Sequence, residues 1–590
     1  MEARAGRLKR WFGQPARWLS FLAGGIPAVL VFPAPSLSEV AWFALVPGMA
    51  LFARAPSVRE AVARGWWFGA GYLIAMLYWM APEIGPGLVL VGAVFGGLYA
   101  PFAIAAHGLL RPPLSWRSAL GALVVVPSCW LVPEWVRSYQ GLGGPWDLYG
   151  ASQWQHPAVL ALAAIGGVWL VSVALVMANT AIMIILITAT SAARTPLRTP
   201  PSPSESAVHT PIAVATALSP ARVWAVRTLG VAAFIAAAGA GPLAFALTPP
   251  FPAVRTVRVA LVQPGVVHNP VARADASETL TEQLSRGHPF GRRARSARRP
   301  YGNSGPHGSP AKKPDLIVWG ESSIAEDLTL PSSRPLLRRI EALSARDGAE
   351  ILVSQDASPP GKGHEKWGVL VSSSGIKGIY VKTRLVPFGE YIPFRGELGW
   401  LTSVSKAAGS NMTPGTGAHL LHAVSRTGKP LPIGVLTCFE SAFPDMSRVD
   451  ADLGAQLIIY QSATSTFQGT WGPDQHASLA ALRAAETGRP TVQAALTGDS
   501  VAFDARGRQL VRLGQLASGV TTVPLSLPGG SARTFYDRFG DYVMWAGVGI
   551  SAVAAAVMFA RRRGFLGGTA GAADGHGAQY EAGTGQPVAS

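Results

Sequence analysis

The stretch LPIGVLTCFESAF, residues 431–443, is the most informative part of this chain of 590 residues. Its first half is apolar and predicts a buried strand, and polar residues and then a helical pattern follow it. Cys438 stands at the predicted turn between strand and helix, where its sulfur would lie beside free backbone N–H groups. This position is typical of a nucleophile, and burial as a small core residue is the alternative.

Similar apolar runs lie on both sides of this stretch. They are RTVRVALVQ (255–263), PDLIVWGE (314–321), AEILVSQD (349–356), WGVLVSSSG (367–375), GIYVKTRLV (378–386), AQLIIYQS (455–462), TVQAALTG (491–498) and SVAFDARG (500–507). Stretches with helical periodicity, such as 331–347 and 474–488, separate some of them. This alternation predicts an α/β domain over residues 248–540, with an antiparallel hairpin around 368–385.

The rest of the chain is strongly apolar. Hydrophobic residues make up 49% of the sequence and charged residues 14%, against roughly 25% charged in ordinary soluble domains. Seven apolar stretches precede the α/β domain, near 11–32, 37–53, 66–82, 86–110, 117–136, 157–190 and 223–247. An eighth follows at 541–560. We therefore predict about eight transmembrane helices, seven in a domain of residues 1–247 and one C-terminal helix at 541–563.

Basic residues are concentrated in alternate loops between these stretches. They are Arg54, Arg59, Arg64, Arg111, Arg117, Arg194, Arg198, Arg222 and Arg561 to Arg563. Because such residues accumulate on the cytoplasmic side, both termini are predicted to be cytoplasmic and the α/β domain extracytoplasmic, in a multi-pass membrane protein. This bias also accounts for the net charge of +17 without a nucleic-acid partner. The alternative for the first stretch is a cleaved signal peptide.

Three segments have compositions that predict disorder. Residues 191–221 are rich in Pro, Ser and Thr and would form a cytoplasmic loop. Residues 286–313 are basic and rich in Gly and Pro, which indicates an insertion within the α/β domain. Residues 564–590 are rich in Gly and Ala and would form a cytoplasmic tail.

Like Cys438, two charged residues lie at the ends of predicted strands. Glu321 ends the run 314–321, and Lys382 follows the residues GIYV (378–381). A carboxylate in an apolar setting can act as a general base, and an ammonium group can stabilise a thiolate or an oxyanion. Either residue alone could equally be a solvated surface charge, but with Cys438 they suffice for acyl transfer through a thioester. The sequence contains no HExxH, CxxC, P-loop or GxGxxG pattern, so we expect no metal and no cofactor.

The wider sequence around these residues resembles a known family. Glu321, Lys382 and Cys438 resemble the Glu-Lys-Cys triad of the nitrilase superfamily. Longer stretches resemble the apolipoprotein N-acyltransferase family, and the likeness spans nearly the whole chain. These stretches are PEWVRSYQGLGGPWDLYGASQ (133–153), VALVQPGV (259–266), VKTRLVPFGEYIPFR (381–395), TCFESAFPD (437–445) and GPDQHASLAALRAAETGRP (472–490).

This resemblance implies a nitrilase-like α-β-β-α sandwich attached to a polytopic α-helical membrane domain. It implies that Cys438 is the nucleophile, Glu321 the general base and Lys382 the cation beside the tetrahedral intermediate. It also implies substrate-binding or supporting roles for Glu390, Phe439 and Glu440. The two glutamates could instead be structural ion-pair members, which would still orient Lys382 or the loop of Cys438.

The resemblance extends to His476 and is weaker at residues 461–469. His476 resembles the second residue of a Gln-His pair, and we expect it to pack or to form hydrogen bonds. Residues 461–469 read QSATSTFQG, where the family commonly has a run like Asn-Asp-Ala-Trp-Phe. Phe467 and Trp471 are candidates to replace part of that run. The change bears on substrate positioning more than on the triad.

The resemblance implies acyl transfer in two steps. A membrane phospholipid would donate an acyl chain to the cysteine, and the N-terminal amine of an S-diacylglyceryl-cysteine lipoprotein would accept it. The expected partners are thus a phospholipid donor, a diacylglyceryl lipoprotein acceptor and the membrane. One alternative is a membrane-tethered amidase or nitrilase, with water as the acceptor. Another is a catalytically inactive homologue that serves as a membrane scaffold, which only the changed run 461–469 favours.

Overall fold

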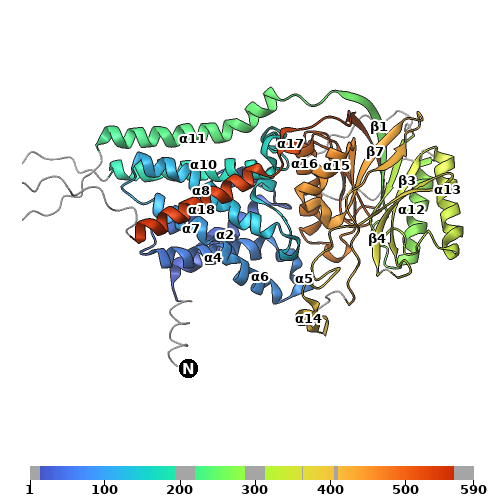
Figure 1. The fold of residues 1–590 in the computed structure, drawn as a ribbon, viewed down its shortest axis with the longest axis horizontal. Helices are drawn as coiled ribbons and strands as arrows, with labels where there is room; N and C mark the ends of the chain where they lie inside the picture. The colour runs from blue at the N-terminus through green and yellow to red at the C-terminus, as the bar shows by residue number, and fades with distance from the viewer. Residues whose placement is uncertain (1–12, 194–218, 286–312, 362, 404–408, 564–590) are drawn as a thin grey trace, which may run out of the picture.

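The computed structural model describes residues 13–193, 219–285, 313–361, 363–403 and 409–563. The predicted disordered segments 286–313 and 564–590 lie outside these ranges, except for residue 313. The predicted loop 191–221 lies mostly outside them, and helix covers both of its ends. Figure 1 shows the apolar helices at one end of the molecule and two β-sheets at the other.

The N-terminal part is a bundle of helices, joined by one helix from the C-terminal end of the chain. Its main helices are α2 (Pro15–Val31), α3 (Val46–Ala53), α4 (Val58–Met76), α6 (Gly87–Phe95), α7 (Ala100–Leu109), α8 (Trp116–Arg137), α10 (Ala163–Ala193) and α11 (Pro220–Leu247). Short helices connect them, among them η1 (Ser38–Trp42), η2 (Tyr78–Met80), α5 (Ala81–Ile84), η3 (Gly96–Tyr99), η4 (Gln140–Leu142), η5 (Tyr149–Gln153) and α9 (Pro157–Leu160). The C-terminal helix α18 (Tyr542–Arg562) packs against α8.

Five helical segments of the described residues are long and apolar enough to cross a membrane. They are Gly87–Leu109, Trp116–Arg137, Ala163–Thr190, Pro220–Leu247 and Tyr542–Arg561. Pro15–Val31 and Ser38–Ala53 are apolar but shorter. Near 66–82 the chain forms the second half of α4 and then η2 and the start of α5, and the first turns of α4 carry Arg59, Glu60 and Arg64. The described residues therefore contain five candidate transmembrane helices, and the predicted count of about eight is not confirmed.

The α/β part contains two six-stranded sheets. The first has the order β12-β1-β2-β3-β4-β5 and the second β11-β10-β9-β8-β7-β6. The strands of the first are β1 (Ala253–Gln263), β2 (Leu316–Trp319), β3 (Glu350–Ala357), β4 (Glu365–Ser372), β5 (Gly375–Val381) and β12 (Gly519–Pro528). Those of the second are β6 (Leu421–Val424), β7 (Pro430–Thr437), β8 (Leu457–Ser462), β9 (Thr491–Ala495), β10 (Ser500–Phe503) and β11 (Gln509–Leu513). The predicted hairpin is confirmed, since β4 pairs antiparallel with β5.

Helices cover the outer faces of both sheets. In Figure 1, α12 (Pro270–Ser285) and α13 (Arg334–Asp347) lie beyond the first sheet, and α15 (Pro444–Leu453) and α16 (Gly472–Thr487) lie beyond the second. The central strands β2, β8 and β9 are buried along their whole length, as expected for strands whose sheet is covered on both faces. The arrangement is the predicted α-β-β-α sandwich.

Helix α16 joins the sandwich to the helical bundle. It is buried along almost its whole length, and the carboxylate of its Glu486 accepts the backbone N–H of Val168 at 2.9 Å. Val168 directly follows a break in α10, where Gly167 has a φ of +67°. A Cβ at Gly167 would lie 2.6 Å from the ring of Tyr536, in α17 (Phe535–Phe539), so glycine allows this close approach.

Candidate active site

The three residues predicted as a triad meet where their strands end. Glu321, Lys382 and Cys438 follow β2, β5 and β7. The Nζ of Lys382 lies 3.6 Å from Oε1 of Glu321, and the Glu321 carboxylate is near enough to the Cys438 thiol to raise its pKa. The structure therefore brings these residues together from positions that are far apart in the sequence.

Backbone packing positions Glu321. Its N–H donates to Ser462 O at 3.2 Å, and its Oε2 accepts the N–H of Ala463 at 3.0 Å. Both partners lie at the end of β8 in the opposite sheet. Gly320 allows this approach, because a Cβ there would lie only 1.9 Å from the backbone nitrogen of Leu496.

A carboxylate shared by two loops positions Cys438. The cysteine opens the short helix η9 (Cys438–Ala442) and has a φ of +50°, a region that non-glycine residues rarely adopt. Two residues later, Glu440 accepts the N–H of Thr437 at 2.7 Å, and it also accepts those of Thr383 at 2.8 Å and Arg384 at 2.9 Å. Glu440 thus links the loop of the nucleophile to the loop that follows Lys382.

Lys382 is fully buried and lies between two carboxylates. Its Nζ is 2.7 Å from Oε1 of Glu390, which is closer than Glu321. Burial alone would lower the pKa of Lys382, but Glu390 and then Glu321 raise it well above the ordinary value. Burial alone would likewise raise the pKa of Glu390, but Lys382 and Lys366, with a hydrogen bond from the Val386 N–H, together lower that pKa. Both groups are therefore charged, and Glu390 fixes the ammonium group beside Glu321.

The thiol of Cys438 is protonated in the resting site. Burial first, and then the charge of Glu321, raise the pKa of the thiol well above its ordinary value. A thiolate would form only as Glu321 takes up the proton. The site can thus generate its nucleophile when an electrophile arrives, with an ammonium group at hand for the negative charge that develops.

Sequence reasoning missed a second ammonium group at Glu321. Lys366 Nζ, from β4, lies 3.5 Å from Oε1 of Glu321, 3.1 Å from Oδ1 of Asp356 and 2.7 Å from the hydroxyl of Ser322. Burial would lower the pKa of Lys366, but Glu321 and Asp356 raise it above the ordinary value. The available signal was a lysine directly before the apolar run 367–375 and an aspartate at the end of the run 349–356.

The remaining predicted residue, Phe439, faces the helical part. Its ring packs edge-on against Phe443, with centroids 5.0 Å apart. A Cβ at Gly144, in the loop after α8, would lie 2.8 Å from the ring of Phe439. From the same loop, Gln140 donates its side-chain N–H to Leu385 O at 2.9 Å. The site therefore lies directly against the chain that leaves α8.

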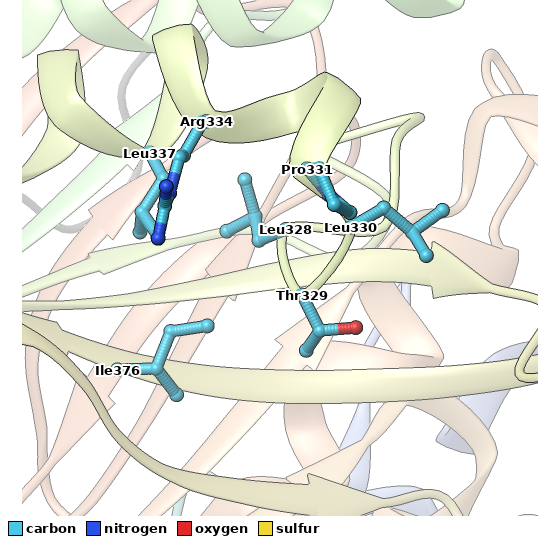
Figure 2. Close-up of a pocket in the computed structure, with 7 residues that line it drawn as sticks. All are labelled: Leu328, Thr329, Leu330, Pro331, Arg334, Leu337 and Ile376. Atoms are coloured by element: carbon cyan, nitrogen blue, oxygen red, sulfur yellow. The ribbon is translucent and has the colours of Figure 1, made fainter.

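A pocket elsewhere contains none of the predicted residues. It has a volume of about 430 Å³ and lies beside α13 and β5 (Figure 2). It is lined by Leu328, Thr329, Leu330, Pro331, Arg334, Leu337 and Ile376. Within the described ranges, no group of three or more His, Cys, Asp and Glu side chains is arranged to hold a metal ion.

Known proteins match both parts of the chain. Residues 24–181 match the family described as Apolipoprotein N-acyltransferase N-terminal domain, and residues 259–532 match Carbon-nitrogen hydrolase. Apolipoprotein N-acyltransferase of Agrobacterium fabrum is 28% identical, over 95% of this chain and 100% of its own length. That of Geobacter metallireducens is 27% identical, over 95% of this chain and 99% of its own length.

Among solved structures, the carbon-nitrogen hydrolase from Helicobacter pylori G27 is 15% identical, with a TM-score of 0.33, over 46% of this chain and 89% of its own. The two family matches follow one another along the chain in the same order as its helical and α/β parts. The curated relatives extend over both parts. The chain therefore belongs to the apolipoprotein N-acyltransferase family.

Proposed function

We propose that this protein moves an acyl chain from a membrane phospholipid, through a thioester on Cys438, to the N-terminal amine of S-diacylglyceryl-cysteine lipoproteins. The observation that carries this proposal is the grouping of Glu321, Lys382 and Cys438 at neighbouring strand ends, beside the chain that leaves an apolar helix. The names of the relatives support the same reaction.

In the first step, the cysteine takes the acyl chain. Glu321 accepts the thiol proton while the sulfur of Cys438 attacks the ester carbonyl, and Lys382 stabilises the oxyanion of the tetrahedral intermediate. The C–O bond then breaks. The lysophospholipid leaves with the proton that Glu321 returns to its oxygen, and the thioester remains on the protein.

In the second step, the amine takes the chain. The free amine of the lipoprotein attacks the thioester carbonyl, Glu321 accepts a proton from the nitrogen, and Lys382 again faces the oxyanion. The C–S bond breaks, the amide forms and Cys438 regains its proton. Glu390 and Glu440 act here as supporting residues that hold Lys382 and the two loops.

Attachment to apolar helices suits this chemistry. Extracting an acyl chain from lipid into water costs about 0.8 kcal/mol for each CH₂ group exposed. A site beside the bilayer avoids this cost for donor and acceptor alike. Five helices of the described chain are long and apolar enough to anchor it.

The orientation in the membrane follows from the basic loops. We propose that both termini are cytoplasmic, and that the α/β domain lies on the extracytoplasmic side of the inner membrane. The corresponding division is a membrane domain at 1–247, a catalytic domain at 248–540 and a C-terminal transmembrane helix at 541–563. Lipoprotein acceptors that have already been exported would meet the site on that side.

The proposal is tested by intact mass. Purified protein is incubated with a defined phospholipid, and then a diacylglyceryl-cysteine peptide is added. We expect an adduct with the mass of one acyl chain that hydroxylamine removes and that passes to the peptide amine. An adduct lost only to water would indicate a hydrolase. No adduct, in folded protein with several phospholipid classes, would indicate a scaffold.

The close contact at Gly320 leads to a first prediction. Gly320→Ala should slow adduct formation about 100-fold, because its Cβ would push the end of β2 away from Leu496 and move Glu321 by a fraction of an ångström or more. The measurement is the single-turnover rate of adduct formation. Gly519→Ala is the matched control, since this strand glycine has open space around its Cβ position. Equal rates for Gly320→Ala and wild type would contradict the prediction.

A further inference from the structure

His476 of α16 contacts the backbone of the nucleophile. Its Nε2 lies 3.0 Å from Cys438 O, and its Nδ1 lies 3.2 Å from the hydroxyl of Ser462. Because a carbonyl oxygen can only accept, Nε2 must carry the proton and donate it. In the neutral ring Nδ1 then accepts from Ser462. Burial lowers the pKa of His476 despite the Cys438 carbonyl, so the imidazole is neutral at pH 7, as this pattern requires.

These two hydrogen bonds join both halves of the triad. Ser462 is the residue whose carbonyl accepts the N–H of Glu321, and the next N–H along the chain, of Ala463, binds the Glu321 carboxylate. On the other side of the ring, Cys438 is held at a φ of +50°. His476 therefore lies between the backbone that holds the general base and the backbone that holds the nucleophile.

An aromatic ring from the helical part supports this histidine. Trp146, in the loop after α8, stacks on His476 with the centroids 5.7 Å apart and the planes at 13°. The indole N–H of Trp146 donates to Oε1 of Gln475 at 3.1 Å, and Arg137 of α8 donates to its backbone carbonyl at 2.8 Å. The position of Trp146 is thus set from both sides, by α16 and by α8.

The aromatic contacts continue into the run that departs from the family. Trp79, in η2, lies against Trp146 with the centroids 5.2 Å apart, and Phe467 packs edge-on against Trp79 at 4.7 Å. Trp471 packs in the same way on Tyr78 at 4.7 Å. Phe467 therefore docks the changed run on the helical part, Trp471 does the same two residues beyond it, and rings connect Phe467 to His476.

We propose that His476 is a positioning residue for thioester formation, and that Trp146 holds its ring so that docking of the α/β domain on the helical part sets the geometry between Glu321 and Cys438. This inference rests on the proposed function. Misplacement of reacting groups by about 1 Å can cost roughly 100-fold in rate. Neither residue touches the reacting atoms, so both would act through the backbone of the triad.

Four variants separate this role from simple packing. His476→Phe keeps a ring against Trp146 and removes the donor to Cys438 O. His476→Gln keeps an N–H donor and removes the ring. Trp146→Leu removes the stacking partner. Trp154→Leu is the matched control, because Trp154 is also buried at the junction but packs on Phe503 of β10, with centroids 6.4 Å apart.

Three measurements are made on each variant in a Cys129→Ala background. They are the single-turnover rate of adduct formation over a range of phospholipid concentrations, the rate of Cys438 alkylation by iodoacetamide, and the thermal unfolding midpoint. We expect His476→Phe to slow adduct formation about 100-fold, with the half-saturating phospholipid concentration unchanged. His476→Gln should recover to within about fivefold of wild type, Trp146→Leu should be slowed about tenfold, and Trp154→Leu should match wild type.

Several results would overturn the inference. His476→Phe could react as fast as wild type, His476→Gln could be as slow as His476→Phe, or Trp146→Leu could equal Trp154→Leu. If His476→Phe does not fold, the comparison of Trp146→Leu with Trp154→Leu tests the inference by itself. If wild type forms no adduct at all, the proposed function fails. Alkylation of Cys438 needs no lipid, so it still tests how the thiol is positioned. If His476 positions the thiol, alkylation should be slower in His476→Phe than in wild type and should recover in His476→Gln.

Discussion

The Cys438→Ala variant should form no acyl adduct with any phospholipid and should acylate no peptide. The sulfur of Cys438 is the proposed carrier of the acyl chain, and removal of a triad nucleophile costs on the order of 10⁴-fold or more in rate. The fold should persist, because Ala and Cys both carry a Cβ and meet the same strain at a φ of +50°. The measurement is intact mass after incubation with phospholipid, together with the thermal unfolding midpoint.

The second cysteine provides the control for this prediction. Cys129 lies buried in α8, so Cys129→Ala should retain both the adduct and its transfer. Cys438→Ser adds a chemical check, since any acyl group on its hydroxyl would be an oxygen ester that neutral hydroxylamine leaves in place. An adduct of unchanged yield in Cys438→Ala would show that the acyl chain is attached elsewhere.

The Lys382→Met variant should lose both activity and stability. Its ammonium group is fully buried between Glu390 and Glu321, and removing one partner of such a cluster leaves buried carboxylates uncompensated, at a cost of about 3–5 kcal/mol. Loss of the oxyanion partner should also slow adduct formation roughly 100- to 1,000-fold. Chemical denaturation in detergent and the single-turnover rate measure the two effects separately.

A double variant separates the two losses. Lys382→Met with Glu390→Gln removes one uncompensated charge and should regain part of the stability, while adduct formation stays slow. Lys377→Met is the matched control, because Lys377 lies exposed on β5, the strand that Lys382 follows, and it should behave like wild type. A stable and active Lys382→Met variant would rule out a role for this ammonium group at the oxyanion.

The sequence alone predicted the elements that carry the site. Apolar runs with strand periodicity located β2, β5 and β7, and helical periodicity located α13 and α16. These patterns depend on which face of an element is buried, so they can be recognised within a window of a few residues. The predicted strands end at or next to Glu321, Lys382 and Cys438. The resemblance of longer stretches to the family then implied that these three residues act together.

Transmembrane helices were predicted less well. Apolar composition located all five helical segments that are long and apolar enough to cross a membrane, whereas the stretch near 66–82 forms the second half of α4 and then η2 and α5. Average hydropathy over a window of residues does not show where a helix begins. Helix α4 begins at Val58, so its first turns contain charged residues that lie before the predicted span.

Only the tertiary structure decided which side chains surround the triad. Lys366 reaches Glu321 because β4 and β3 pair within one sheet, and Trp146 reaches His476 because the loop after α8 docks on α16. These partners are separated by long stretches of chain, and no local pattern encodes a distance between them. Such contacts arise from the packing of sheets and helices on one another, which requires the whole fold to be in place.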